Sequence, residues 1–267
     1  MELPYDKFIC SFLERFPTYQ LRSQPQSLED LSFWVFSVND EEGSQNDSYS
    51  SSDRMMVHDM VISAFSNVKT SYNYIVQLWA PVTIGGRQLL STYRQPFAVR
   101  YLYTKSENHR LRCEKYGYNV NVNNESIVDD NEHNCWPEIK SSGPPLSAFL
   151  NGLPEISSSV HQEAGPLLGD GYEESQLMGS LFLIPIFNPS GSSSSSDCIG
   201  VVECLTDVTD IFSFFEMNRA LERVVSHQEV LFYPHKPEVI VSWVEKRQSY
   251  SQIIVCSGSY LYLVKPK

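Results

Sequence analysis

Two pairs of side chains have the types and spacing that could support metal or redox chemistry. His133 and Cys135 lie two residues apart in an acidic segment, but two ligands are too few for a zinc site, which takes about four. Cys198 and Cys204 lie six residues apart in an apolar run. An even separation places both thiols on one face of a regular strand. There they could form a redox pair. We favour the alternative that both are small apolar residues of the strand.

Motifs of common enzyme families do not occur in the chain, which contains no GxSxG, HExxH or GxxxxGK[ST] pattern. The adjacent acidic residues Asp129 and Asp130, like Glu173 and Glu174, could act as acid and base only in a buried cleft. Their polar surroundings favour exposure to solvent. The sequence therefore predicts a protein that is not an enzyme, and no catalytic, cofactor-binding or metal-binding residue is assigned.

The charge balance is acidic. Lys and Arg number 20 against 32 Asp and Glu, a net charge of −12. A protein that binds nucleic acid needs a basic face, and so does a protein that binds an anionic membrane. Neither partner is therefore expected. Residues 121–175 hold ten acidic side chains and one basic one, Lys140. Such a segment could bind a cation, but a solvated loop is the favoured interpretation.

The cysteines and the N-terminus indicate an intracellular protein. The six cysteines have no CxxC and no framework spacing, so free thiols are expected. The first residues lack the basic start and apolar core of a secretory signal. No apolar run approaches the roughly 18 residues of a membrane helix.

The first elements that the pattern predicts are a helix, a strand and a second helix. Residues 5–16 form an amphipathic pattern that Pro17 ends. Residues 31–38 are typical of a strand, and residues 39–52 of a serine-rich linker. Asp53 is a suitable N-cap for a helix whose apolar stripe occupies positions 57, 60, 61, 64, 65 and 68.

Two β-hairpins are the clearest local predictions. Residues 75–82 and 87–93 flank Gly85 and Gly86, which can take the positive φ angles of a tight turn. Residues 178–187 and 199–205 flank a serine-rich tip and form a second hairpin.

The other segments are less regular. Residues 98–140 are polar and aromatic and are treated as irregular, with a long loop over residues 119–134. A turn at 143–145 precedes one or two helical turns at 146–150, and another amphipathic helix begins near Asp210. Residues 239–245, 252–256 and 260–264 are typical of strands. This order predicts an α+β fold, an antiparallel sheet with helices on one face.

An ordered set of motifs resembles a known family. It runs VQLWAPV (76–82), Gly85-Gly86, LST (90–92) and QPF (95–97), and later AFL (148–150), LPE (153–155), GSLFLIPIF (179–187), CIGVVE (198–203) and RALE (219–222). From about Asp53 to Val225 the chain resembles the N-terminal region of the plant NIN-like proteins. The resemblance implies a GAF-like antiparallel sheet flanked by helices, with long loops.

The resemblance also implies a domain organisation and a function. Residues 1–52 would be an N-terminal segment and linker, 53–226 a GAF-like regulatory domain, and 227–267 a β-rich tail of unknown role. The family comprises transcription regulators of nitrate-responsive genes, found in the nucleus or cytoplasm. Its DNA-binding RWP-RK and oligomerising PB1 domains have no counterpart here, so this chain is not expected to bind DNA directly.

The expected partners are nitrate or another small anion, and other transcription regulators. Ile156 stands where the family has Trp, and Met178 where it usually has Arg, a donor suited to planar anions. The ligand-binding residues are therefore left unassigned, and no cofactor is expected. The alternative is a protein-interaction module that has lost its ligand and modulates full-length relatives.

Overall fold

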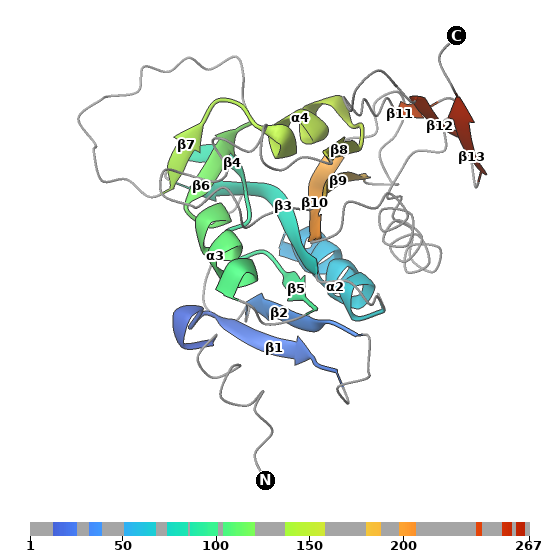
Figure 1. Ribbon diagram of the computed structural model, residues 1–267. Coiled ribbons are helices and arrows are strands. Elements are labelled where there is room, and N and C mark those ends of the chain that lie inside the picture. Colours follow the sequence, from blue (N-terminus) through green and yellow to red (C-terminus); the bar gives the residue numbers. More distant parts are fainter. Residues whose placement is uncertain are drawn as a thin grey trace.

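The computed structural model describes residues 13–25, 32–38, 51–67, 74–84, 86–100, 104–120, 137–157, 180–187, 198–206, 239–241, 253–257 and 260–264. These residues form a mixed α/β structure dominated by one large sheet (Figure 1). Within the described residues, no helix is long and apolar enough to cross a membrane.

The large sheet contains ten strands among the described residues. They are β1 (Tyr19–Ser23), β2 (Trp34–Val38), β3 (Tyr74–Ile84), β4 (Arg87–Ser91), β5 (Phe97–Val99), β6 (Tyr116–Asn119), β7 (Glu138–Lys140), β8 (Glu155–Ser157), β9 (Ser180–Phe187) and β10 (Cys198–Thr206). Their order is β1-β2-β5-β3-β10-β9-β8, and off this path β4 pairs with β3 and β6, and β6 with β7. Among these described strands, the β6–β7 pairing alone is parallel. The mostly antiparallel sheet is compatible with the expected α+β class.

Both predicted hairpins are present. Strands β3 and β4 pair antiparallel, with Ile84 opposite Arg87, so a two-residue turn joins them. Strands β9 and β10 pair from Phe187 to Ser180 against Cys198 to Thr206. In the first turn Gly86 has φ of +77°, a conformation that glycine adopts without the steric cost of a Cβ atom.

We expect Gly86→Val to destabilise the protein by about 1–2 kcal/mol, because a β-branched residue resists positive φ. Open space surrounds Gly86, so the penalty is conformational and not a clash. Gly86→Asn, which tolerates this region better, is the control and should cost clearly less. Urea unfolding of both variants measures the difference, and equal losses would contradict the conformational explanation.

Helices cover both faces of the sheet, which corrects the expected one-sided arrangement. Helix α2 (Ser51–Asn67) packs on one face through Met60, Val61, Ala64 and Phe65. Helix α3 (Thr104–Cys113) and helix α4 (Pro144–Asn151) lie apart from α2 (Figure 1). Their Cys113, Leu146 and Ala148 join the core on the other face. The central strands are apolar on both faces, so both need cover.

Strand β3 shows this two-sided burial directly. Ile75 and Trp79 belong to the cluster beneath α3 and α4, while Val76 and Leu78 belong to the cluster beneath α2. Successive side chains of a strand point to opposite faces. The sheet is therefore the middle layer of the structure, with a core on each side.

Several boundaries differ from the expected ones. Helix α2 begins at Ser51, so Asp53 lies within its first turn instead of capping it, and residues 51–52 are not linker. An aspartate is favourable both at the N-cap and in the first turn of a helix. The residue type at position 53 therefore could not show which of the two positions it occupies. Pro144 and Pro145 open helix α4 instead of forming a separate turn, as proline suits the first helical position.

Residues 98–140 are more regular than expected, which is a second correction. They contain part of β5, all of α3, and strands β6 and β7. Helix α3 was missed because two of its buried positions are His109 and Arg110, which interrupt an apolar stripe. Strand β2, helix α4 and the three C-terminal strands confirm their predictions. Those strands are β11 (Val239–Val241), β12 (Ile253–Ser257) and β13 (Tyr260–Val264), paired antiparallel.

Cys198 and Cys204 lie on opposite faces of β10, so the expected shared face is wrong. Cys198 packs against the cluster beneath α3 and α4, whereas Cys204 lies in the cluster beneath α2. The pairing of β10 with β9 shifts register between Cys198 and Gly200. A bulge adds one residue and reverses the alternation that follows. The two thiols therefore cannot form a pair across one face.

The reactivity of Cys198 should be low. Burial raises its pKa to about 11, against an ordinary value of 9.0, and hydrogen bonding with the backbone of Gly200 and Ile186 opposes the shift. The thiolate is the reactive form, and its smaller population is offset in part by its greater nucleophilicity, so we expect alkylation about tenfold slower than for a thiol of ordinary pKa. Peptide mass spectrometry after iodoacetamide labelling at neutral pH measures the rate. Labelling as fast as in urea-unfolded protein would contradict the prediction.

The remaining expectations lie outside the described residues. They are the helix over residues 5–12, the loop over residues 121–136, the serine-rich tip and the helix beginning near Asp210.

Candidate functional site

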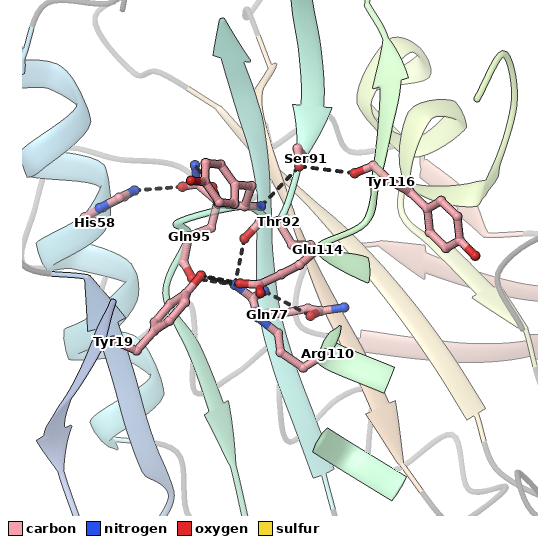
Figure 2. A network of polar contacts seen from close by, with 10 residues as sticks. Tyr19, His58, Gln77, Ser91, Thr92, Gln95, Arg110, Glu114 and Tyr116 are labelled. Carbon is pink, nitrogen blue, oxygen red and sulfur yellow. Dashed lines mark hydrogen bonds and ion pairs between the residues drawn. The ribbon is translucent and has the colours of Figure 1, made fainter. Parts of the chain in front are cut away.

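A buried arginine, Arg110 of α3, is the centre of a polar network between the sheet and the helix (Figure 2). Its Nη2 donates to the carbonyl oxygens of Thr92 at 2.6 Å and Gln95 at 3.0 Å. These carbonyls belong to the turn between β4 and β5, which the Gln95 N–H closes by donating to Thr92 O at 3.0 Å. Arg94 in this turn has φ of +57°. The turn thus aims two carbonyl groups at one guanidinium.

Side chains complete the coordination of Arg110. Its Nη2 also donates to the hydroxyl of Tyr19 at 2.6 Å and to Glu114 Oε1 at 3.0 Å, and its Nη1 donates to Gln77 Oε1 at 3.1 Å. The Tyr19 hydroxyl donates in turn to Glu114 at 2.6 Å (Figure 2). Tyr19 begins β1, so this network ties the edge strand to helix α3. Charge-assisted bonds of this kind are the stronger class of hydrogen bond.

Aromatic rings enclose the guanidinium. The Arg110 carbon Cζ lies 4.6 Å from the ring centroid of Phe97 and 5.4 Å from that of Tyr19. Such cation–π contacts strengthen when they are shielded from water. Arg110 Nε and Thr92 Oγ1 are buried and have no hydrogen-bond partner among the described residues. Each is a polar atom that a small ligand or a water could satisfy.

A second buried group lies next to the first, centred on Glu203 of β10. Its Oε1 contacts His109 Nε2 at 2.6 Å and accepts from Gln77 Nε2 at 3.0 Å, and its Oε2 accepts from Trp79 Nε1 at 2.5 Å. Gln77 therefore bridges the two groups, since its oxygen binds Arg110 and its amide nitrogen binds Glu203. Gln77 and Trp79 are two residues apart on β3 and share the face toward α3.

The buried charges compensate one another. Burial would lower the pKa of His109, but its interactions with Cys113 and Glu203 outweigh this and raise that pKa to about 10. Burial raises the pKa of Glu203, yet the charge of His109 and the hydrogen bonds from His109, Trp79 and Gln77 bring it below its usual value. His109 and Glu203 thus form a buried ion pair, and Arg110 pairs with Glu114.

His58 connects this network to the helix on the other face. Its Nε2 lies 2.7 Å from Gln95 Oε1 (Figure 2). Gln95 therefore contacts Arg110 through its backbone and α2 through its side chain. The turn between β4 and β5 is held from both layers.

The residues that the sequence singled out are not part of this site. His133 and Cys135, and the acidic residues at 129–130 and 173–174, lie outside the described residues, as does Met178. Ile156 lies in β8. Sequence reasoning missed His109, Arg110, Glu114 and Tyr19. The available signal in the sequence was a charged and polar run over residues 104–114 that follows an aromatic one over residues 97–103. Burial of the charged groups becomes visible only once their partners are known.

The residues of the family motifs do converge here. Gln77 and Trp79 come from VQLWAPV, Gln95 from QPF and Glu203 from CIGVVE. Four motif residues that span 127 positions of the chain, from 77 to 203, thus meet around α3.

The fold and this network define a mixed α/β domain with a buried, charge-balanced polar centre. Over about half of its length, the chain is homologous to the NIN-like proteins. It is 32% identical over 138 residues to Protein NLP7 of Arabidopsis thaliana, 51% of this chain and 12% of that protein. It is 25% identical over 148 residues to Protein NLP1 and 27% identical over 137 residues to Protein NLP2, both of Arabidopsis thaliana.

These matches cover 54% and 50% of this chain and 14% and 12% of those two proteins. The matched region therefore spans less than one sixth of the length of each relative. No family model matches the chain, and no solved structure gives a significant match. The expected resemblance to NIN-like proteins is confirmed by the three relatives.

Proposed function

We propose that this chain contains a GAF-like regulatory module of the NIN-like type, which influences transcription of nitrate-responsive genes. It would act in the nucleus or cytoplasm and not at a membrane. The module would span residues 53–226, with residues 1–52 as an N-terminal segment whose strands β1 and β2 pair into the sheet of the module. Residues 227–267 would be an additional tail. The observation that carries the proposal is that the motif residues converge on two adjacent residues of α3: Gln77 and Gln95 bind Arg110, and Glu203, held by Gln77 and Trp79, binds His109.

A small anion such as nitrate is the ligand that this centre would suit. The site contains a buried guanidinium, that of Arg110, and its Nε has no hydrogen-bond partner among the described residues. A guanidinium offers fixed, coplanar N–H donors that match a planar anion. Binding would require the anion to replace part of the existing set of acceptors around Arg110.

Calorimetry with the whole chain tests the ligand. Titration with millimolar sodium nitrate should release heat that sodium chloride does not. Arg110→Lys keeps the charge but removes the planar donor set, so its nitrate heat should vanish. Arg22→Lys, at an exposed arginine of β1, is the matched control and should behave as the wild type. Absence of heat from the folded wild-type protein at millimolar nitrate would refute the sensor part of the proposal.

One observation favours the second candidate, a protein-interaction module without a ligand. The Nη1 and Nη2 atoms of Arg110 already bind five groups of the protein itself. A centre that supplies its own acceptors can hold the fold together without an anion. This candidate predicts that a tagged chain retains NIN-like proteins from plant extract, equally with and without nitrate. Failure to retain them in either condition would exclude it.

A further inference from the structure

Three side chains with metal-ligating atoms meet between α3 and the sheet. The ligand atoms of His109, Cys113 and Glu203 all lie within 4.8 Å of one another, and all three residues are buried. His109 and Cys113 are four positions apart on α3, which places them one above the other on the same face of the helix. Glu203 projects from the centre of β10.

The three groups converge on one atom, His109 Nε2. It lies 2.6 Å from Glu203 Oε1, 3.5 Å from Cys113 Sγ and 3.3 Å from Gln77 Nε2. Because Gln77 Oε1 accepts from Arg110, the nitrogen of Gln77 is the atom that faces His109. If His109 Nε2 carries a proton for Glu203, it cannot also accept from the Gln77 amide. The 3.3 Å contact between Gln77 and His109 is then not a hydrogen bond, although the Gln77 amide still donates to Glu203.

We propose that His109, Cys113 and Glu203 bind a zinc ion. Imidazole nitrogen, thiolate sulfur and carboxylate oxygen are the three donor types that zinc uses in proteins, whereas calcium and magnesium take oxygen ligands. The thiolate and carboxylate balance the two charges of the ion, with the imidazole neutral. On binding, the zinc ion displaces the protons of His109 Nε2 and Cys113 Sγ, which pass to solvent. The lone pair of His109 Nε2 then binds the metal. Water would complete the coordination.

The surroundings of Glu203 suit a metal ligand. Trp79 donates to Oε2, which fixes the carboxylate and leaves Oε1 directed toward His109 and Gln77. Partners of this kind orient the ligands of metal sites, and their loss typically weakens metal affinity about 10–100-fold. We expect that loss for Trp79→Phe, which keeps the aromatic bulk and removes the N–H donor.

The test uses the whole chain, dialysed against zinc-free buffer after incubation with zinc and analysed by mass spectrometry for metal content. The wild type should retain about one zinc ion per chain. Cys113→Ser and His109→Gln should lose it. Cys198→Ser, at a half-buried thiol elsewhere in the fold, is the matched control and should keep it. No zinc in the folded wild type, or full retention in both ligand variants, would overturn the proposal.

Cobalt substitution keeps the test decisive if a ligand variant fails to fold. Cobalt bound through Cys113 gives a thiolate charge-transfer band in the near ultraviolet. A chain in which the other five of its six cysteines are serine should keep this band, since Cys113 remains. Added zinc should displace the cobalt and abolish the band. A folded five-serine chain that shows no band with cobalt would refute the site.

Discussion

Replacing Arg110 by Met should destabilise the protein by about 3–5 kcal/mol, the cost of removing one partner from a buried ionic network. Met fills a similar volume but supplies no donor. The carbonyls of Thr92 and Gln95, and the Gln77 side chain, would lose a hydrogen-bond donor inside the protein. Each unsatisfied buried acceptor adds to the loss. Urea unfolding followed by far-ultraviolet circular dichroism measures the change.

The matched control for this prediction is Arg22→Met. Arg22 is exposed and donates to Ser37 Oγ at 2.6 Å on the neighbouring strand. Contacts of exposed charges are worth little, so we expect a change within about 0.5 kcal/mol. A similar loss of stability in both variants would mean that Arg110 is no more important than a surface arginine.

Replacing Glu203 by Gln should have the second largest effect, also about 3–5 kcal/mol, measured on chelator-dialysed protein so that bound metal contributes nothing. Glutamine keeps the shape of the side chain but removes the negative charge opposite His109. A buried imidazolium without a counter-charge is costly, so His109 must either lose its proton or destabilise the fold. The control is Glu138→Gln, at an exposed position of β7, which should change stability by at most about 0.5 kcal/mol.

A double-mutant cycle measures the interaction energy between His109 and Glu203 apart from their contacts with other residues. His109→Gln combined with Glu203→Gln removes both charges, so the double variant should lose less stability than the sum of the two single losses. Additive losses would contradict the ion pair. They would indicate instead that Glu203 acts mainly through Trp79 and Gln77.

Much of the local structure could be predicted from the sequence because it depends on neighbouring residues. The β3–β4 hairpin depends on Gly86, whose positive φ is a property of a few adjacent positions. The stripe of Met60, Val61, Ala64 and Phe65 identified the buried face of α2. Periodicity predicts these elements reliably because each needs only one apolar face.

The features that the sequence did not predict all depend on contacts between residues far apart in the chain. Helix α3 is charged and was treated as irregular, yet Arg110 is fully buried because Gln77, Thr92, Gln95 and Tyr19 supply its partners. The faces of Cys198 and Cys204 depended on a bulge in the pairing with β9. Sequence spacing assumes a regular strand and cannot anticipate such a shift.

The sequence by itself determined the two hairpins, the apolar face of α2 and the family motifs, because these follow from local propensity and ordered residue types. Only the tertiary structure decided that helices cover both faces of the sheet and that Gln77, Trp79, Gln95 and Glu203 meet Arg110 and His109. The physical reason is that a buried charge is tolerated only beside its partners. Here those partners come from strands and a turn that lie far from α3 in the chain.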